Sequence, residues 1–207
     1  MTGCCFKKRK RVLKMKNKEK DIRAYFNKLD RSFFMDRFKE MASFDEAIPI
    51  GHEQTISQPS LVLEMTLALE PETDSRVLEI GTGSGFQTAL LAEFASQVYT
   101  VERIEELYHR AKERLDESGF SNISFKLDDG SMGWEENAPY DRIMVTAAAS
   151  AIPEELLNQL AFGGKMIIPV GSSFSQELKL IEKDKNGKIQ STVLNHVRFV
   201  PLKGKYE

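Results

Sequence analysis

The chain has 207 residues, 41% of them hydrophobic, which is enough for one globular domain with a sizeable core. Its formal net charge of −2 conceals a polarised distribution, because nine of the 29 Lys and Arg residues lie in residues 1–20 beside one of the 31 acidic residues. The two cysteines, Cys4 and Cys5, are adjacent, which excludes a Cys-based metal site and an ordinary structural disulfide.

Residues 1–20 form a basic leader that we expect to be disordered, ahead of a single domain over residues 21–207. A basic tail can bind nucleic acid or anionic lipid, but we interpret this one as a solvated leader, or as extra codons before a true start at Met15. It lacks the apolar middle of a signal peptide, and the sequence has no apolar run of about 18 residues that could span a bilayer. We therefore expect a cytoplasmic protein, and we take it as a monomer with no nucleic-acid or membrane partner.

The first part of the domain, residues 21–70, is predicted to be largely helical. From Asp21 to Met41, apolar residues recur at roughly helical spacing. Because Asp30-Arg31-Ser32 is a plausible break, this pattern predicts either one long helix or two short ones that pack on the main domain.

A loop and a second helix follow. Pro49 and Gly51 predict a loop from Phe44 to Gly51. Pro59 suits the first turn of a helix, since its missing N–H is not needed there. The leucines that follow Pro59, together with the scarcity of charge, predict that this helix is well buried.

Residues 71–171 are predicted to form an α/β core in which strands and helices alternate. Glycines mark helix ends, as at Gly119 and Gly163-Gly164. The alternation implies a parallel sheet with right-handed crossovers. The predicted strands are Arg76–Thr82, Gln97–Val101, Ile123–Leu127, Arg142–Thr146 and Lys165–Val170, and the predicted helices are Phe86–Phe94, Ile104–Leu115 and Pro153–Leu160.

The C-terminal part, residues 172–207, departs from this alternation. Glu177–Glu182 and Ile189–Val200 are predicted strands, and Asn186-Gly187 between them is a strong hairpin signal. The predicted fold class is therefore α/β: a Rossmann-like, doubly wound, mostly parallel sheet that ends in an antiparallel hairpin and follows a helical N-terminal segment.

A glycine turn follows the first strand of the core. Gly81, Gly83 and Gly85 permit a tight turn and a close approach of the backbone to a ligand. The dinucleotide fingerprint G-x-G-x-x-G would need its third glycine at Phe86, so that motif fails. The turn is typical of a nucleoside site that does not hold a pyrophosphate.

Three carboxylates lie at the ends of three successive predicted strands. Glu79 precedes the glycine turn and suits an ammonium or another cationic part of a ligand. Glu102, 21 residues after Gly81, can accept hydrogen bonds from both ribose hydroxyls. Asp129, followed by Gly130, can accept from an adenine amino group. The cationic nucleoside that such a crevice suits is S-adenosylmethionine.

A hydroxyl stands just upstream of the helix that begins near Pro59. Ser57 reads either as a cap of that helix or as a functional group. No His or Cys is placed to activate it, and a nucleophile motif of the form G-x-S-x-G does not occur. Acyl-enzyme chemistry is therefore not supported.

Together these segments resemble the bacterial type of the protein-L-isoaspartate O-methyltransferase family, a group of class I S-adenosylmethionine-dependent methyltransferases. The similarity covers about residues 20–203 in colinear order. The glycine turn is common to many methyltransferases, whereas Gln54–Pro59 combined with Arg198–Leu202 is much narrower. Further matching segments are Ile48–Gly51, Val77–Gly85, Tyr99–Arg103, Asp129-Gly130, Ala138–Asp141, Thr146–Ala149, Gly163-Gly164 and Pro169–Gly171.

The resemblance implies methyl transfer from S-adenosylmethionine to the α-carboxyl of L-isoaspartyl residues in damaged proteins and peptides, which initiates their repair. It makes Ser57 the catalytic hydroxyl that orients the acceptor carboxylate, and it implies no metal. The cofactor-binding residues implied in this way are Gln54, Thr55, Ile56, Glu79, Gly81, Gly83, Gly85, Glu102, Asp129 and Gly130, and the substrate-binding residues are Ser57, Ala147, Arg198 and Val200.

Two positions depart from the family pattern. Glu53 replaces the second glycine of Gly-x-Gly-Gln-Thr-Ile-Ser, and Ser131 stands where a larger residue often follows Asp-Gly. A carboxylate four residues before Ser57 could repel an isoaspartyl carboxylate or narrow the peptide preference. These departures bear on substrate range more than on reaction type.

Two other functions remain open at this point. One is a methyltransferase of RNA or of a small carboxylic acid, which the basic leader favours slightly. The aromatic-proline motif of base-amino methylators is absent, however, and Thr146-Ala147-Ala148-Ala149 stands in its place. The other is a non-catalytic cofactor-binding module, against which the intact Ser57 and glycine turn both argue.

Overall fold

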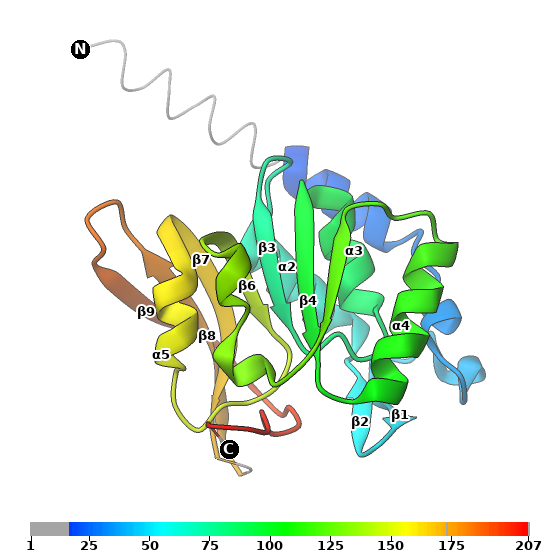
Figure 1. Cartoon of the computed structure of the whole chain (residues 1–207). Coiled ribbons are helices and arrows are strands. Elements are labelled where there is room, and N and C mark those ends of the chain that lie inside the picture. Colours follow the sequence, from blue (N-terminus) through cyan, green and yellow to red (C-terminus); the bar gives the residue numbers. More distant parts are fainter. Residues whose placement is uncertain (1–16, 173, 207) are drawn as a thin grey trace.

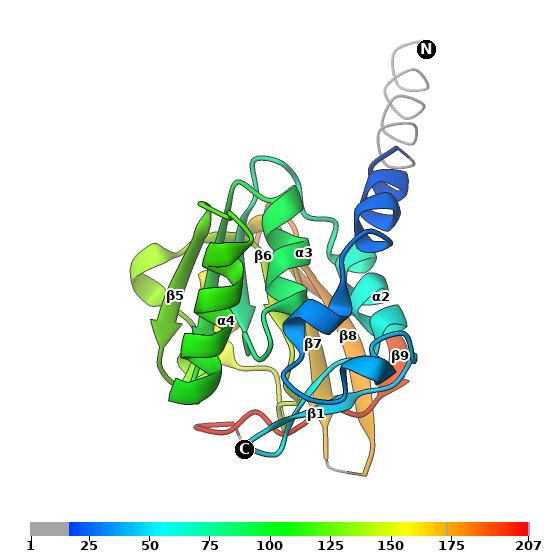
Figure 2. The same ribbon diagram turned by 90° about the vertical axis from the view of Figure 1, so that its right-hand side faces the viewer.

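The computed structural model describes residues 17–172 and 174–206 (Figures 1 and 2). Its centre is a seven-stranded sheet with the order β5-β4-β3-β6-β7-β8-β9. The first five strands in that order run parallel, whereas β8 is antiparallel to both β7 and β9. The predicted fold class is confirmed. The strands are β3 (Arg76–Ile80), β4 (Gln97–Glu102), β5 (Ile123–Leu127), β6 (Tyr140–Val145), β7 (Leu160–Gly171), β8 (Gln176–Lys183) and β9 (Ile189–Val197).

Helices cover both faces of the sheet. On one face, α2 (Pro59–Leu69) and α3 (Phe86–Phe94) pack their apolar side chains on Val77 and Val98. On the other face, α5 (Glu154–Gln159) packs with Leu78. Neighbouring strand residues thus face opposite layers, and both layers are apolar, as expected for a parallel sheet buried on two sides. The amphipathic helix α4 (Glu105–Glu117) adds Leu115 to a third apolar cluster with α3.

The strand order reverses at β3. From β3 the chain proceeds to β4 and β5 on one side, and later strands fill the other side from β6 onward. A crevice forms at the carboxyl ends of the strands wherever an open α/β sheet reverses its order in this way. The fold therefore fixes where a ligand site belongs before any side chain is considered.

The N-terminal segment differs from its prediction in one respect and agrees with it in another. A helix occupies residues 17–26, so the last four residues of the leader are helical rather than disordered. The predicted break is confirmed, because Asp30 accepts a hydrogen bond from the Ser32 N–H and starts a separate 3₁₀ turn. These turns are η1 (Arg31–Phe34) and η2 (Lys39–Met41). The predictions for residues 1–16, including Cys4, Cys5 and Met15, lie outside the described residues.

The loop predicted from Phe44 to Gly51 is partly wrong. Its end is a strand, β1 (Ile48–Gly51), which pairs with β2 (Gln54–Ile56) in a separate antiparallel ribbon. Both strands of a two-stranded ribbon are edges, where proline is tolerated because its missing N–H can face away from the partner. Gly51, His52 and Glu53 form the turn, all with positive φ.

Two boundaries near the end of the sheet also moved. Gly163-Gly164 lies inside β7, and α5 already ends at Gln159. The reason is an irregularity in the pairing with β6, where Tyr140 opposes Leu160 but Arg142 opposes Lys165. The predicted hairpin between β8 and β9 is confirmed, although β9 ends at Val197, so that residues 198–200 leave the sheet.

Candidate active site

A cleft of about 840 Å³, its mouth included, lies at the carboxyl edge of the sheet beside the strand reversal. Distant parts of the chain form it: β2 with the start of α2, the segments that follow β3, β4, β5 and β6, and the segment that follows β9. Figure 1 shows the β1–β2 hairpin and the C-terminal segment at this same lower end of the molecule. A cleft at the carboxyl edge of such a sheet, beside the strand reversal, is typical of a site for a small molecule or cofactor.

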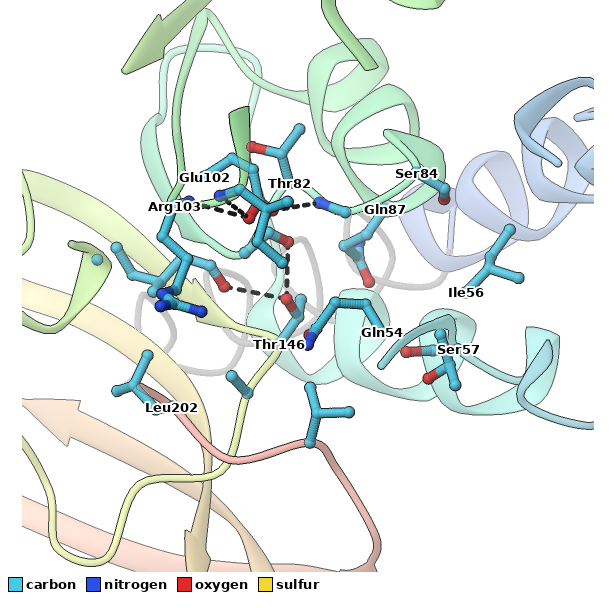
Figure 3. A pocket seen from close by; sticks show the side chains of 18 of the residues that line it. Gln54, Ile56, Ser57, Thr82, Ser84, Gln87, Glu102, Arg103, Thr146 and Leu202 are labelled. Atoms are coloured by element: carbon cyan, nitrogen blue, oxygen red, sulfur yellow. Dashed lines mark hydrogen bonds between the residues drawn. The ribbon is translucent and has the colours of Figure 1, made fainter. Parts of the chain in front are cut away.

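Most of the residues predicted from the sequence line this cleft. They come from both the glycine turn and the acceptor motif, which the fold brings together although about 25 residues separate them in sequence (Figure 3). The predicted residues in the lining are Gln54, Thr55, Ile56, Ser57, Gly81, Gly83, Glu102, Gly130, Ala147 and Val200.

Four predicted residues do not line it. Glu79 is fully buried behind the cleft. Gly85 faces α4, where an added Cβ would lie 3.1 Å from Leu115 Cδ1. The Asp129 carboxylate accepts a hydrogen bond of 2.8 Å from the Ser131 N–H, and Arg198 is exposed. The roles assigned to these residues remain predictions.

The glycine turn is a cradle that side chains would fill. Gly81 has φ +93°, and a Cβ added there would collide with the Thr146 hydroxyl. That hydroxyl lies 2.7 Å from the Gly81 carbonyl and 3.0 Å from the Ile80 carbonyl, so it pins the turn to the end of β6. Gly130 is equally constrained, because a Cβ there would meet Ile80. The backbone is therefore held bare where a ligand approaches it.

Backbone N–H groups orient the carboxylate of Glu102. Its Oε2 accepts from the Gly83 N–H, and its Oε1 accepts from the N–H groups of Arg103 and Ile104, each at 2.9 Å. A carboxylate has about four lone-pair sites, so one remains on Oε2 for a donor in the cleft. Glu102 is only 5% exposed and is fixed before any ligand arrives, which suits a ribose hydroxyl.

Glu79 does not line the cleft, and a chain of two hydroxyls, Thr100 and then Thr82, connects it to the lining. Its Oε2 accepts hydrogen bonds from Thr88 Oγ1 at 2.6 Å and from Thr100 Oγ1 at 2.7 Å. Because the Thr100 hydroxyl donates its one proton to Glu79, Thr82 is the donor in the 2.6 Å contact between Thr82 and Thr100. The lone pairs of the Thr82 oxygen then remain for the cleft, which Thr82 lines.

The environment of Glu79 favours its neutral form. Complete burial raises the pKa of Glu79 to about 7, against the hydrogen bonds from the two threonines. The nearby carboxylate of Glu102 adds to this increase. The second carboxylate oxygen of Glu79, Oε1, is buried without a hydrogen-bond partner among the described residues. Because Glu79 does not line the cleft, the direct contact with a ligand ammonium expected from the sequence stays a prediction.

Ser57 is not the cap of α2. The cap comes from Asp45, whose Oδ1 accepts from the Ser60 N–H at 2.8 Å, and this bond lowers the pKa of Asp45. Among the described residues, the Ser57 hydroxyl has no hydrogen-bond partner, and Ser57 lines the cleft. The structural interpretation of Ser57 therefore loses its basis, and its hydroxyl is available to a ligand.

Arg31 holds the acceptor motif in place. This side chain is 5% exposed, and its Nη2 donates to the carbonyls of Glu46 at 2.8 Å and Ser57 at 3.0 Å. Further donations reach the carbonyls of Ala42, Phe44 and Ile56. Burial lowers the pKa of the Arg31 guanidinium, with Asp45 opposing the change. One cation thus ties the loop before β1 to the residue that carries the candidate catalytic hydroxyl.

The segment after β9 closes the far wall of the cleft. Ala148 N–H donates to the Val200 carbonyl at 2.8 Å, and Leu202 N–H donates to the Ala148 carbonyl at 2.7 Å. These bonds place Val200 and Leu202 against the strand end that carries Ala147. Further along, the Tyr206 hydroxyl donates to Glu155 at 2.6 Å and so fastens the segment to α5.

Several lining residues were not predicted. Thr82 and Ser84 are the variable positions of the glycine turn, so the motif itself could have indicated them. Arg103 and Thr146 adjoin predicted residues. Gln87 was signalled by nothing in the sequence, yet its side-chain oxygen is a buried acceptor without a partner. The unpredicted lining residues are Val62, Ile80, Thr82, Ser84, Phe86, Gln87, Val101, Arg103, Ile104, Thr146, Pro201, Leu202 and Lys203.

These features fit S-adenosylmethionine. The bare glycine turn, the oriented Glu102 and the unpartnered Gln87 oxygen supply surfaces for an adenosine and for a donor group. Within the part of the chain that the structure describes, no group of three or more His, Cys, Asp or Glu side chains could hold a metal ion. No described helix has the length and apolar character needed to cross a membrane.

Comparisons with known proteins show the family of this chain. Residues 7–207 match the model of the family described as protein-L-isoaspartate(D-aspartate) O-methyltransferase. The protein-L-isoaspartate O-methyltransferase of Dictyoglomus turgidum is 54% identical over 180 residues, which are 86% of this chain and 81% of that protein. The corresponding protein of Vibrio atlanticus is 50% identical over 175 residues, which are 84% of this chain and 83% of that protein.

Solved structures of the same family share this fold. A protein-L-isoaspartate O-methyltransferase from Plasmodium falciparum, in complex with S-adenosyl-L-homocysteine, superposes with a TM-score of 0.74 and 28% identity, covering 84% of this chain and 85% of that one. A second protein-L-isoaspartate O-methyltransferase superposes with a TM-score of 0.79 and 25% identity over 93% of this chain and 67% of that one.

Proposed function

The chain belongs to the protein-L-isoaspartate(D-aspartate) O-methyltransferase family, and from this premise we propose how its cleft performs that reaction. The enzyme transfers a methyl group from S-adenosylmethionine to the α-carboxyl of L-isoaspartyl residues in damaged proteins and peptides, which initiates their repair. The observation that carries this function is the meeting, in one cleft, of the glycine turn with Glu102 on one side and the Ser57 hydroxyl on the other.

The reaction needs alignment rather than a base. A peptide carboxylate has a pKa of about 4 and is already anionic at neutral pH. Bound S-adenosylmethionine supplies a methyl group on a sulfonium centre, so attack by the carboxylate oxygen cancels charge. A dry cleft that fixes the acceptor oxygen in line contributes most of the acceleration. Among the described residues that line the cleft with Ser57 there is no His or Cys, which is consistent with this chemistry.

We assign the two walls of the cleft to the two reactants. Glu102 accepts from the ribose, the glycine turn receives the nucleoside, and Gln54, Thr55 and Ile56 close over it. Ser57 donates to the acceptor carboxylate, and Ala147 and Val200 form the peptide wall. We retain Arg198, Asp129, Glu79 and Gly85 as proposals for roles outside the lining.

The direct test is methyl transfer from labelled S-adenosylmethionine to matched peptides that contain L-isoaspartate or L-aspartate at one position. We expect base-labile label in the isoaspartyl peptide alone. Label in neither peptide, with the cofactor still bound, would overturn the acceptor assignment and direct attention to RNA or small carboxylic acids.

Ser57→Ala tests the assigned hydroxyl. We expect kcat for the isoaspartyl peptide to fall about 100-fold, a loss typical of removing one oriented donor from an active site. Cofactor affinity, measured by calorimetric titration with S-adenosylhomocysteine, should change less than about twofold, because the hydroxyl holds the other reactant. A tenfold loss of cofactor affinity would count against the role.

We also infer that residues 21–207 act as one domain and that the enzyme is a monomer, works in the cytoplasm and needs no nucleic acid. The apolar clusters on the two faces share one sheet, which supports the single domain. Light scattering during size-exclusion chromatography would test the monomer, and fractionation of cells would test the compartment.

A further inference from the structure

Gln87 is a buried side chain with a vacant acceptor in the cleft. It lies in the first turn of α3, directly after the glycine turn, and is 7% exposed. Figure 3 shows its side chain reaching into the cleft, between Thr82 on one side and Ser57 on the other. Its Oε1 has no hydrogen-bond partner among the described residues. A buried carbonyl oxygen without a partner costs about 1–3 kcal/mol, so the position calls for an explanation.

The orientation of the Gln87 amide follows from its neighbour. The Thr66 hydroxyl donates its one proton to the Val62 carbonyl at 2.8 Å. Thr66 can therefore only accept from Gln87, so the amide nitrogen must face it, as it does at 2.9 Å. The amide oxygen is thereby turned toward the cleft. Because Thr66 is fully buried in α2, its hydroxyl fixes the orientation of the Gln87 amide from the side opposite the cleft.

The charges around the cleft indicate which donor the oxygen awaits. Among the described lining residues, Glu102 is the one acidic side chain, and three backbone N–H groups already bind it. Glu79 lies behind Thr100 and Thr82. An ammonium group entering beside the glycine turn therefore meets neutral acceptors, namely the Gln87 oxygen and the lone pairs of Thr82.

We propose that Gln87 is a cofactor-binding residue whose Oε1 accepts a hydrogen bond from the α-ammonium of the methionine part of S-adenosylmethionine. The assignment rests on the proposed function, since that function supplies the ligand. It replaces Glu79, which the sequence had suggested for this task. A neutral acceptor satisfies the ammonium without adding a third buried carboxylate next to Glu79 and Glu102, of which Glu102 already disfavours the charged form of Glu79.

The test compares two ligands that differ in the amino-acid part. S-Adenosylhomocysteine carries the ammonium, whereas 5′-methylthioadenosine lacks it together with the carboxylate. The variant Gln87→Met keeps the length and removes the acceptor. We expect its affinity for S-adenosylhomocysteine, measured by calorimetric titration, to fall at least about tenfold, as for a lost hydrogen bond to a charged group. Its affinity for 5′-methylthioadenosine should stay within about twofold.

A second variant separates binding from folding. Thr66→Val removes the partner that orients the amide and leaves Gln87 itself in place, so we expect a smaller loss that again affects S-adenosylhomocysteine alone. Equal losses for both ligands would reduce Gln87 to a structural residue and overturn the proposal. Unchanged affinity for S-adenosylhomocysteine with a raised peptide KM would also overturn it, because the donor would then belong to the acceptor peptide.

These titrations use no acceptor peptide. If the wild-type protein binds S-adenosylhomocysteine but labels no isoaspartyl peptide, the proposed function fails while the assignment of Gln87 can still be confirmed. If the peptide is labelled and Gln87→Met binds S-adenosylhomocysteine normally, the assignment fails while the proposed function is confirmed.

Discussion

The two walls of the cleft are built on different principles. The cofactor wall is formed by the turns after β3 and β4 and consists almost entirely of local backbone. It comprises the glycines and Glu102, whose carboxylate accepts from N–H groups of these two turns. The acceptor wall, formed by Ser57 just after β2 and by the segment after β9, comes from two distant parts of the chain. Arg31 and the bonds to Ala148 hold these parts in place. One wall is therefore preformed by geometry, and the other depends on tertiary contacts.

The largest test of this difference is removal of the Arg31 guanidinium. Arg31→Met leaves the carbonyls of five residues without their donor, and we expect about 4 kcal/mol less stability toward unfolding. Arg31→Lys keeps the charge but loses the planar guanidinium. Relative to Arg31→Met, it should therefore recover part of the stability and a smaller part of the kcat for the peptide.

Denaturant unfolding and the two kinetic constants check this prediction. Arg31 contacts the carbonyls of Ile56 and Ser57 but no lining residue of the glycine turn, so cofactor affinity in the folded Arg31→Lys protein should change less than about threefold. Equal losses of cofactor affinity and peptide turnover would show that the two walls are one unit, and the comparison would fail.

On the cofactor wall, the matching test is Gly81→Ala. The backbone at this position has φ +93°, which alanine rarely adopts, and the new methyl group collides with Thr146 Oγ1. We therefore expect a loss of about 3–4 kcal/mol, seen as more than about 100-fold weaker cofactor binding or as unfolding. Gly119→Ala is the control, because Gly119 has φ +79° but open space around it. If both variants behave alike, the backbone conformation alone explains the glycine, and the close approach of Thr146 has no role.

The same contrast explains what the sequence could predict. The glycine turn and Glu102 were predicted because a few consecutive residues specify both the backbone shape and the chemistry. The β1–β2 ribbon was missed because Pro49 and Gly51 favour a loop locally, while the ribbon depends on tertiary contacts. Arg31 and Gln87 were missed because their partners are carbonyls or a distant hydroxyl, and backbone carbonyls leave no mark in a sequence.

The buried carboxyl behind the cofactor wall predicts a pH dependence of stability. The pKa of Glu79 rises to about 7 in the folded protein from 4.5, so the folded state holds its proton more tightly than the unfolded chain. The stabilisation is complete below pH 4.5, declines as the pH rises through 7, and is absent above it. We expect wild-type protein to lose about 3 kcal/mol of stability from this group over that range.

Glu79→Gln should remove this slope, because the amide does not titrate. Urea unfolding at pH 5, 6, 7 and 8 measures it in both proteins, and the difference between them isolates Glu79 from every other group. A constant difference across these pH values would mean that Glu79 is ionised throughout. The hydrogen bonds that lead from Glu79 through Thr100 to Thr82 would then start from a permanently charged carboxylate.

The smallest effect is expected at the tip of the acceptor hairpin, where this chain has Glu53 in place of the family's glycine. Glu53 has φ +59° and is exposed, and it does not line the cleft. Glu53→Gly relieves the left-handed strain but gives the unfolded chain more freedom, so we expect a net gain in stability below about 1 kcal/mol.

Glu53→Gln keeps the strain and removes only the charge. Because an exposed charge is screened within about 8 Å at physiological salt, the KM for an isoaspartyl peptide should fall by less than about twofold in either variant. A large fall in both variants at physiological salt would mean that the carboxylate faces the acceptor after all. The tip would then set the peptide preference, and the acceptor wall would extend beyond β2.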